Sequence, residues 1–406
     1  MSVTHPTIDQ PRESGAAMNV QGRCDPGEAG RIRPRVLFIG LFPPPVNGQR
    51  IVTQCMFEQL DAAATVARFD IDRFRRLGPF SKLLSAIAAC GVLVIARLRG
   101  YSTLYLAPHS GAGLIYSCLI ALASRLCGFA LVVHYHSYRN LGRYTRLMAG
   151  FLALCGPNAL HIALAPPMAR DLRRLYRSAR QVTVLSNTTF VAPRAVERHF
   201  AERRLRVGHL SNLSREKGID SVLDCMRGLW ARGVGVELWL AGPAEDAHTG
   251  RLIAAAQAEF GDRIKYLGRL VSAQVTAFYD EIDIFLFPTA YEHEAEPLVV
   301  VDAVSAGVPV IATDRGCIGY LLGITGGRVL AAEAFVAQSV EQIAAWARDP
   351  AQLAESSAQA QARFAELHEH SRRQLERLLA TIVNGLTTEP EPSSTDRRSA
   401  ASSRPR

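Results

Sequence analysis

Short runs of consecutive apolar residues recur along the chain and alternate with longer segments of helical pattern. They predict strands at 35–40, 66–71, 103–107, 130–134, 159–163 and 182–185, and again at 205–210, 236–241, 264–267, 284–287, 308–312 and 327–330. Strands that are apolar throughout indicate parallel sheets with helices on both faces. We therefore predict an α/β fold of two doubly wound, Rossmann-like domains in tandem.

The same pattern suggests where the domains begin and end. We predict a disordered tail (1–33), a first Rossmann-like domain (34–190), a linker (191–203), a second Rossmann-like domain (204–365), a terminal helix that packs back on the first domain (366–384) and a second disordered tail (385–406). Doubly wound sheets bind ligands outside the carboxyl ends of their strands, so we expect an interdomain cleft that holds a ligand.

Composition places the chain among globular proteins, with 48% hydrophobic and 20% charged residues in 406. Its eight cysteines form no C-x-x-C pair and most lie in apolar runs, which predicts buried free thiols in a reducing compartment. The first 33 residues contain no apolar core of signal-peptide length. We therefore expect a cytoplasmic protein.

Charge is distributed unevenly between the two halves. Residues 34–190 hold 18 Lys and Arg against five Asp and Glu, whereas residues 191–384 hold 20 against 25. A basic first half indicates an anionic partner such as nucleic acid, anionic lipid or a phosphorylated substrate, or simply a solvated basic face. Its basic clusters lack the interleaved aromatic residues of a nucleic-acid groove, so we favour an anionic membrane surface and expect no nucleic acid.

Two segments, 83–98 and 113–126, are strongly apolar, but each is shorter than a typical membrane span and is interrupted by Ser, Gly or Arg. Each is followed at once by a predicted strand. We therefore interpret both as buried helices of a layered α/β domain, and leave peripheral membrane contact open.

Candidate chemistry begins with two carboxylates eight positions apart. We expect Glu294 in a loop and Asp302 at the start of a helix that leads into the strand predicted at 308–312. Two acids on either side of such a turn can face one cleft and hold two parts of one ligand. The helix N-terminus between them favours an anionic or polyhydroxylated ligand, although acids are also ordinary in the first turn of any helix.

Two further loops follow the first predicted strand of each domain. The second-domain loop carries Lys217 at the carboxyl edge of the sheet, where an amine is well placed to neutralise a phosphate. The first-domain loop has three prolines and ends at Gly48, which would allow close approach of a ligand or a positive φ. The first-domain loop matches neither the G-x-G-x-x-G pattern nor the Walker A pattern.

Together these segments resemble the retaining nucleotide-sugar glycosyltransferases of family four, an exopolysaccharide-type subgroup in particular. The resemblance covers roughly residues 35–330. It rests in order on Pro-Pro-Pro-Val-Asn-Gly48, Val-Val-His-Tyr-His136-Ser, Leu-Ser-Asn-Leu-Ser-Arg-Glu-Lys217-Gly, Leu-Ala-Gly242-Pro243, and the Glu294 to Asp302 segment with Ala-Gly307-Val-Pro-Val-Ile-Ala-Thr. It implies the GT-B fold, in which two Rossmann-like domains face each other across a cleft.

The resemblance also implies a role for each matching residue. Glu294 would lie near the hydroxyls of the donor sugar, and Asp302 would bind the ribose of the nucleotide. Lys217 would bind the donor diphosphate, and Gly48 would lie where the first-domain loop approaches it. His136 would lie near the donor sugar and the reaction centre; a strand-end histidine with a satisfied hydrogen bond is the alternative.

Three positions depart from the family pattern. Asp302 stands where Glu is usual, which shortens the side chain by one methylene. Asn212 stands where many members carry a second phosphate-binding Arg, and we consider the neighbouring Arg215 or His209 as candidates for that donor.

The third departure lies in the donor-sugar loop. Pro297, directly before Leu298, stands where Gly is frequent and removes one backbone N–H. A Glu-Ala-x-Pro-Leu segment is familiar within the family, so we interpret it as a trait of a subgroup.

From the resemblance we predict transfer of a sugar, with retention and without a metal or other cofactor, from a nucleoside-diphosphate sugar to a glycan or lipid-diphosphate-linked acceptor. The second domain would bind the donor and the first the acceptor, in surface polysaccharide biosynthesis at the inner face of the cytoplasmic membrane. A sugar-nucleotide epimerase or hydrolase of the same fold, or a non-catalytic scaffold at the membrane, are the alternatives.

Overall fold

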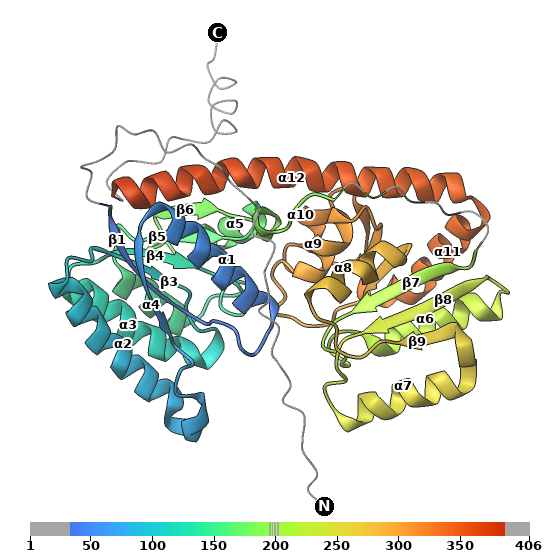
Figure 1. Cartoon of the computed structure of the whole chain (residues 1–406), viewed down its shortest axis with the longest axis horizontal. Helices are drawn as coiled ribbons and strands as arrows, with labels where there is room; N and C mark the ends of the chain where they lie inside the picture. The colour runs from blue at the N-terminus through green and yellow to red at the C-terminus, as the bar shows by residue number, and fades with distance from the viewer. Residues whose placement is uncertain (1–32, 195, 197, 199, 201–202, 386–406) are drawn as a thin grey trace, which may run out of the picture. The chain divides into compact units, whose positions relative to one another are not determined.

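The computed structural model describes residues 33–385 except 195, 197, 199, 201 and 202. The predicted tails lie outside this part of the chain, except for residues 33 and 385, and the predicted linker lies partly outside it. Two six-stranded sheets, parallel throughout, make up the core (Figure 1). The predicted fold class of two doubly wound α/β layers is thus confirmed.

The first sheet has the strand order β2-β1-β3-β4-β5-β6. Its strands are β1 (Arg35–Gly40), β2 (Thr65–Asp70), β3 (Thr103–Leu106), β4 (Ala130–His134), β5 (Leu160–Ala163) and β6 (Gln181–Val184). The helices between them are α1 (Gly48–Ala63), α2 (Ser81–Leu98), α3 (Leu114–Leu126), α4 (Arg146–Cys155) and α5 (Pro166–Leu175), with short 3-10 turns η1 (Arg75–Phe80), η2 (Gly111–Gly113) and η3 (Asn187–Phe190).

Alternate residues of each strand enter two different cores, as the two-residue period of a strand requires. Leu37 and Ile39 of β1 pack with α2, α3 and α4 in one cluster. Val36 and Phe38 pack on the other face with residues of α1 and with the last helix of the chain. The centre of the sheet is therefore buried on both faces, which explains why most residues of its central strands are apolar.

The second sheet has the order β12-β11-β10-β7-β8-β9. Its strands are β7 (Leu205–Leu210), β8 (Val236–Ala241), β9 (Ile264–Tyr266), β10 (Ile284–Phe287), β11 (Val310–Thr313) and β12 (Gly327–Leu330). Its helices are α6 (Ile219–Ala231), α7 (Ala247–Phe260), α8 (Ser272–Glu281), α9 (Leu298–Ser305), α10 (Ile318–Leu322) and α11 (Phe335–Arg348), with 3-10 turns η4 (Gly261–Arg263) and η5 (Ala332–Ala334). β11 begins two residues later than predicted because Pro309 has no N–H to donate to a ladder.

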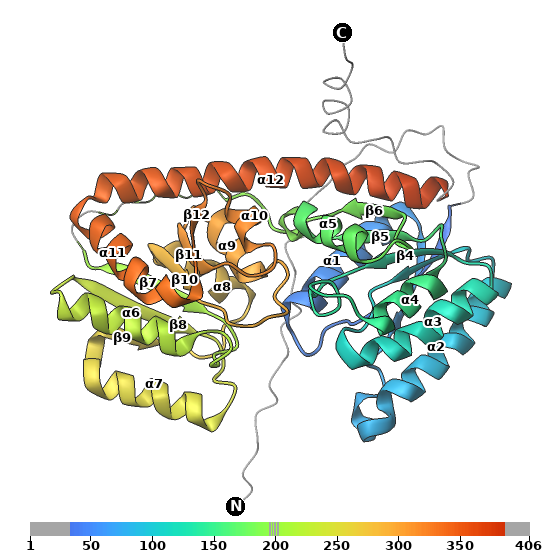
Figure 2. The same cartoon turned by 180° about the vertical axis from the view of Figure 1, so that it is seen from behind.

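The chain ends in one helix of 35 residues, α12 (Pro350–Asn384), which begins with Asp349 as its cap and Pro350 in its first turn. Phe364 and Leu367 of α12 pack in a core cluster of the second sheet. Leu375, Leu378 and Ile382 pack in a cluster of the first sheet. One helix therefore contributes to the cores of both sheets, and both views show it running past elements of each (Figures 1 and 2).

The segments 83–98 and 113–126 are helical as predicted, but the prediction that they are buried is wrong. α2 is apolar enough and long enough to cross a membrane, and only 28% of it is buried. Several large apolar side chains of α2 and α3 point away from the sheet and are exposed. When a helix is apolar on every side, its sequence pattern does not show which side packs against the rest of the protein.

The cysteine prediction is confirmed in part. The seven cysteines in the described residues are all free, but only Cys155, Cys225 and Cys317 are buried. Cys24 lies outside those residues.

Candidate functional site

The order in which the chain adds strands to the second sheet reverses between β7 and β10. The chain runs from β7 outward through β8 and β9, then returns to place β10 on the other side of β7. In open α/β sheets, ligands bind at the carboxyl ends of the two strands that flank such a point. The loops that follow β7 and β10 carry Lys217 and Glu294, so both predicted residues lie where the topology favours a binding site.

The loop after β7 is fixed by a glycine in the left-handed region. Gly218 has φ +82°, and a methyl group there would lie 2.1 Å from the carbonyl oxygen of Pro288. Only glycine fits such a conformation and such close backbone contact. The Ala290 N–H also donates to the Glu216 carbonyl at 2.8 Å. The loops after β7 and β10 are therefore joined backbone to backbone on either side of Lys217.

The loop after β10 is held from its other side by the loop after β11. Gly316 has φ +56°, and a methyl group there would lie 2.2 Å from the carbonyl oxygen of Glu294. The Cys317 N–H donates to the Ala295 carbonyl at 2.7 Å. The backbone that carries Glu294 is thus fixed on both sides, so its carboxylate is aimed before any ligand arrives.

Lys217 and Glu294 form an ion pair, with 2.6 Å between Nζ and Oε2. The Thr289 hydroxyl donates to the same Oε2 at 3.3 Å. The Lys217 ammonium also lies 4.8 Å from the centre of the Tyr291 ring, a distance at which a cation is attracted to the aromatic face. The two side chains are only 24% and 11% exposed, so their charges are partly shielded from water. An anionic ligand at this site would find a positioned cation.

Asp302 lies elsewhere on the same segment, and the prediction that it starts a helix is wrong. α9 begins at Leu298, with Pro297 at its cap, and Asp302 is the fifth helical residue. Pro297 has no N–H for the helical ladder, so the helix begins directly after it. Burial raises the pKa of Asp302 to about 7, against a smaller lowering by Arg194. Within the described part of the chain, no hydrogen bond or ion pair joins its carboxylate to Lys217 or Glu294.

Glu296 is a buried acid whose place in the structure the sequence did not indicate. It accepts hydrogen bonds from the Ser186 hydroxyl at 2.8 Å and the Asn187 N–H at 2.5 Å. The Asn187 side chain donates in turn to the Glu296 carbonyl at 2.8 Å. Ser186 and Asn187 follow β6, so Glu296 ties the last loop of the first sheet to the loop that carries Glu294. Burial raises the pKa of Glu296 to about 7.

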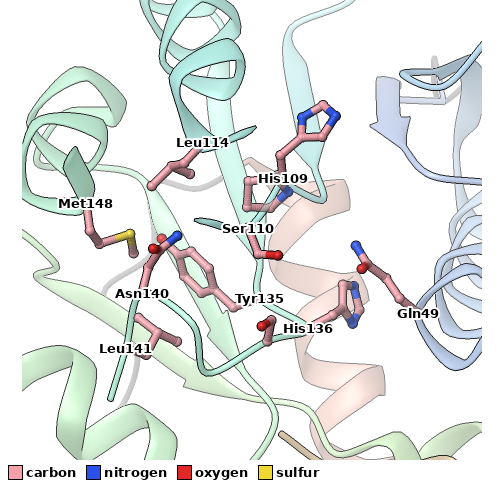
Figure 3. A pocket seen from close by; sticks show the side chains of 11 residues that line it. Gln49, His109, Ser110, Leu114, Tyr135, His136, Asn140, Leu141 and Met148 are labelled. Carbon is pink, nitrogen blue, oxygen red and sulfur yellow. The ribbon is translucent and has the colours of Figure 1, made fainter. Parts of the chain in front are cut away.

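His136 lies two residues beyond β4 and lines a pocket at the carboxyl ends of β3 and β4 (Figure 3). Figure 3 shows the side chains of Gln49, Ser110 and His136 on one side of the pocket and those of Leu114, Leu141 and Met148 on the other. The Nε2 atom of His136 is buried and has no partner among the described residues. Burial lowers the pKa of His136 to about 4, so the ring is neutral near pH 7. It offers an uncharged hydrogen-bonding group of the kind that suits a sugar hydroxyl.

The pocket adjoins the loop of Glu294. The Tyr138 N–H and the Ser137 hydroxyl both donate to the carbonyl of His293, at 3.2 and 3.4 Å. The loop of His136 thus contacts the residue directly before Glu294. His109, in the same pocket, was missed at the sequence level; its signal was the Ala-Pro-His-Ser segment directly after a predicted strand. Burial lowers its pKa to about 4 as well.

Gly48 does not adopt the positive φ that the sequence allowed. It is the first residue of α1, whose cap is Asn47, because the Asn47 side chain accepts the Arg50 N–H and starts the helix there. Space is left at Gly48: a methyl group would lie 3.7 Å from Leu298 Cδ1, an ordinary contact. Gly48 and Leu298 are thus near neighbours from the two sheets. The proline-rich loop before Gly48 is held by Arg50, which donates to the carbonyl of Phe42.

The substitutes considered for the second phosphate-binding Arg lie in different environments. His209 is fully buried and both ring nitrogens are engaged, Nδ1 with the Leu286 carbonyl at 2.8 Å and Nε2 with Ser211 at 3.0 Å. It cannot meet a ligand, and that suggestion is wrong. Asn212 and Arg215 are exposed on the loop after β7. The Arg215 guanidinium lies 3.1 Å from the ring of His248 and 3.5 Å from the carboxylate of Asp220.

Among the residues that the structure describes, no group of three His, Cys, Asp or Glu side chains is arranged to hold a metal ion.

Residues 204–349 match the family model of the glycosyl transferases group 1. The matched segment begins just before β7 and ends just after α11, so it contains Lys217, Glu294 and Asp302. A curated relative is the amylovoran biosynthesis glycosyltransferase AmsK of Erwinia amylovora, 27% identical over 122 residues. That alignment covers 29% of this chain and 30% of AmsK, so the chain matches less than a third of the length of that relative.

Solved structures are similar over most of the chain. HepE of Anabaena in complex with UDP has a TM-score of 0.65 at 18% identity, covering 86% of this chain and 100% of HepE. Sucrose-phosphate synthase of Thermosynechococcus elongatus has a TM-score of 0.65 at 20% identity, covering 86% of this chain and 99% of the synthase chain. The fold is that of the GT-B glycosyltransferases. The GT-B fold predicted from the resemblance is therefore confirmed, and the group 1 match supports its second half in particular.

Proposed function

We propose that this protein transfers a sugar from a nucleoside-diphosphate sugar to a hydroxyl group of an acceptor. The observation that carries the proposal is the Lys217–Glu294 ion pair. It lies at the point where the second sheet changes direction, inside the segment that matches the group 1 glycosyl transferases. A cation for a diphosphate and an acid for sugar hydroxyls are the two groups that a nucleotide-sugar site needs.

The donor is proposed to be a nucleotide sugar, with UDP sugars as the first candidates. HepE has been solved with UDP and with UDP-glucose. In this proposal Lys217 contacts the diphosphate and Glu294 the hydroxyls of the sugar. Asp302 would bind the ribose, and its neutral form at pH values below about 7 would both donate and accept hydrogen bonds. Arg215 and Asn212 would line the exposed edge of the same loop.

The chemical step creates negative charge on the departing nucleoside diphosphate. The bond between the anomeric carbon and the phosphate oxygen breaks, and a bond to the acceptor oxygen forms on the same face of the sugar. The acceptor proton passes to the departing diphosphate, so the configuration is retained and no covalent sugar–enzyme intermediate is formed. Lys217 would stabilise the developing charge electrostatically, and no metal ion is proposed for this role.

The acceptor is proposed to be a glycan or a lipid-diphosphate-linked glycan bound to the first sheet. The pocket of His136, Ser110 and Gln49 offers uncharged hydrogen-bonding groups beside the loop of Glu294. The excess of 18 basic over five acidic residues in 34–190 suits a phosphorylated acceptor. AmsK is named for the biosynthesis of amylovoran, which supports a role in polysaccharide biosynthesis. We extend the proposal to surface polysaccharide synthesis at the inner face of the cytoplasmic membrane.

The proposal is tested in two steps with the purified full chain. Thermal-shift measurements with UDP, GDP and ADP sugars should show stabilisation by one nucleotide class. The stabilising donor is then incubated with and without glycan acceptors, and the products are separated. Transfer that requires the acceptor supports the proposal. Epimerised or hydrolysed sugar formed from the donor alone would favour a sugar-nucleotide epimerase or hydrolase, and no stabilisation by any nucleotide would favour a non-catalytic scaffold.

A further inference from the structure

The outward side of α2 carries large apolar side chains, whereas its inward side carries mostly small ones. The exposed residues recur at helical spacing: Leu83, Leu84, Ile87, Val94, Ile95 and Leu98. The residues buried against the sheet domain are Ser85, Ala86, Ala89, Leu93 and Ala96. A helix whose only role is to cover a sheet has the opposite arrangement, with its large apolar side chains inward.

α3 also exposes large apolar side chains beside α2. Ile115, Leu119, Leu122 and Leu126 are 40% to 79% exposed. Its buried side holds the small residues Ser117, Ala121 and Ser124 together with Leu114 and Ile120. The Cys90 thiol of α2 lies 3.8 Å from the Leu119 carbonyl, and both views show the two helices side by side (Figures 1 and 2). We call the exposed apolar residues of both helices, with Leu77 and Phe80 just before α2, the α2–α3 surface.

The exposed large hydrophobic residues are concentrated on this surface and are not scattered over the protein. It holds 12 of the 17 large hydrophobic residues that are exposed in the described part of the chain. Contiguous apolar patches of this kind mark sites of interaction with a partner or a membrane.

Basic side chains flank the α2–α3 surface. Seven are exposed in or next to its helices: Arg73, Arg75, Arg76, Lys82, Arg97, Arg99 and Arg125. No Asp or Glu occurs in the sequence between Asp72 and Asp171. The basic rim of this surface would therefore attract a negatively charged partner, and no acidic side chain between Asp72 and Asp171 would repel it.

We propose that the α2–α3 surface docks the protein on an anionic lipid membrane. The apolar stripes of α2 and α3 enter the boundary between headgroups and acyl chains, and the basic side chains contact lipid phosphates. Although α2 is apolar enough to cross a membrane, its Ala86 and Ala89 face is buried in the protein. Such a helix lies in the plane of the membrane surface and does not span it.

The charge also argues against a second copy of the chain as the partner. In a twofold symmetric dimer the same surface meets itself, so the basic rim of one copy would face the basic rim of the other. Like charges at an interface oppose association. A surface of anionic lipid supplies the opposite charge and accepts the apolar stripes at the same time.

Vesicle flotation of the full chain tests this proposal, with vesicles of phosphatidylglycerol and phosphatidylcholine in equal parts and with phosphatidylcholine alone. We expect binding to the anionic vesicles that weakens at about 0.5 M salt, where charges are screened beyond ~4 Å. The variant I87E/I95E should lower the partition coefficient by about two orders of magnitude, since two apolar side chains lose their burial in lipid. The variant R97Q/R99Q should lower it by about tenfold or more on anionic vesicles only.

The matched control is V271E/I324E, which places the same two charges at exposed apolar positions of the second sheet unit. It should bind like the wild type, and melting temperatures check that all variants are folded. Equal binding by I87E/I95E and the control would overturn the proposal, as would absence of wild-type binding. So would sedimentation showing a dimer that I87E/I95E dissociates. The assay contains no donor or acceptor, so its outcome is independent of the proposed glycosyl transfer.

Discussion

Lys217 and Glu294 are 77 positions apart in the chain, yet their charged groups lie 2.6 Å apart because β7 and β10 are neighbours in the second sheet. Each partner therefore neutralises the other in the protein without ligand. A donor diphosphate would have to compete with Glu294 for the ammonium of Lys217. This competition gives the two residues distinguishable effects on ligand binding and on turnover.

Lys217→Ala should weaken both nucleotide binding and transfer. The ammonium is proposed to contact the diphosphate before and during departure, and loss of one such electrostatic group costs about 10²- to 10³-fold in kcat. Transfer kinetics with saturating donor measure the effect. The control is Lys265→Ala, which removes another lysine of the same sheet, on β9. A Lys217→Ala variant with more than half of the wild-type kcat would remove Lys217 from the proposed site.

Glu294→Gln should have opposite effects on binding and on turnover. Without the carboxylate, Lys217 is free for the diphosphate, so the affinity for UDP alone should rise by about fivefold, the value of an ion pair worth ~1 kcal/mol. Transfer should fall, because a neutral amide accepts hydrogen bonds from the donor sugar less strongly than the carboxylate of Glu294 does. Titration calorimetry with UDP measures the first effect and product formation the second. Glu292→Gln, an exposed acid two residues away, serves as the control. Weaker UDP binding by Glu294→Gln would contradict the competition.

The strands could be predicted from the sequence because their signal is local. Each central strand is buried on both faces, so most of its residues are apolar. The strands β1, β4, β7, β8, β10 and β12 begin and end where predicted. The orientation of α2 could not be predicted in the same way. Leu83 and Ala86 are both apolar, and only the packed structure shows that Ala86 faces the sheet and Leu83 faces outward.

The residue types of the candidate site and their positions after strands could be predicted from the sequence. Lys217 and Glu294 were each placed after a strand, but their contact depends on which strands are neighbours, and strand order leaves no local pattern. Glu296 was passed over for the same reason, since its partners Ser186 and Asn187 are more than 100 positions away. The start of α9 does not follow from Asp302 because an acidic residue also occurs inside helices, and here Pro297 marks the cap.

His136→Ala should lower transfer by about tenfold, the value of one hydrogen bond of ~1.4 kcal/mol to the reacting sugar or acceptor. The pKa of His136 is lowered to about 4, so its ring is neutral across pH 5–9. The ratio of wild-type to His136→Ala rates should therefore be constant over that range. A pH–rate series of both proteins measures it, with His370→Ala on the exposed side of α12 as the control. A ratio that changes steeply between pH 6 and 7 would show that His136 titrates there and acts as an acid or base.

Asp302→Asn should make the free energy of unfolding less dependent on pH. Burial raises the pKa of Asp302 from 3.8 to about 7, so the folded protein keeps a proton that the unfolded chain releases between these values. The stability supplied by this proton is complete below about pH 4 and is lost as the pH rises to 7. Asn cannot ionise and avoids the loss. The free energy of unfolding of the variant should therefore exceed that of the wild type by at most about 4 kcal/mol at pH 8, and by much less at pH 5.

Urea unfolding at pH 5 and pH 8 measures this difference. Glu296, whose pKa is also raised to about 7, weakens both proteins alike as the pH rises and cancels in the comparison. Asp314→Asn, which makes the same substitution at an exposed aspartate of the same sheet unit, is the matched control. If Asp302→Asn and the wild type differed by the same amount at pH 5 and pH 8, Asp302 would be ionised in the folded protein at both. A charged carboxylate at that depth would then need a cation beside it, and Arg194, whose charge already lowers the pKa of Asp302, would be the residue to substitute next.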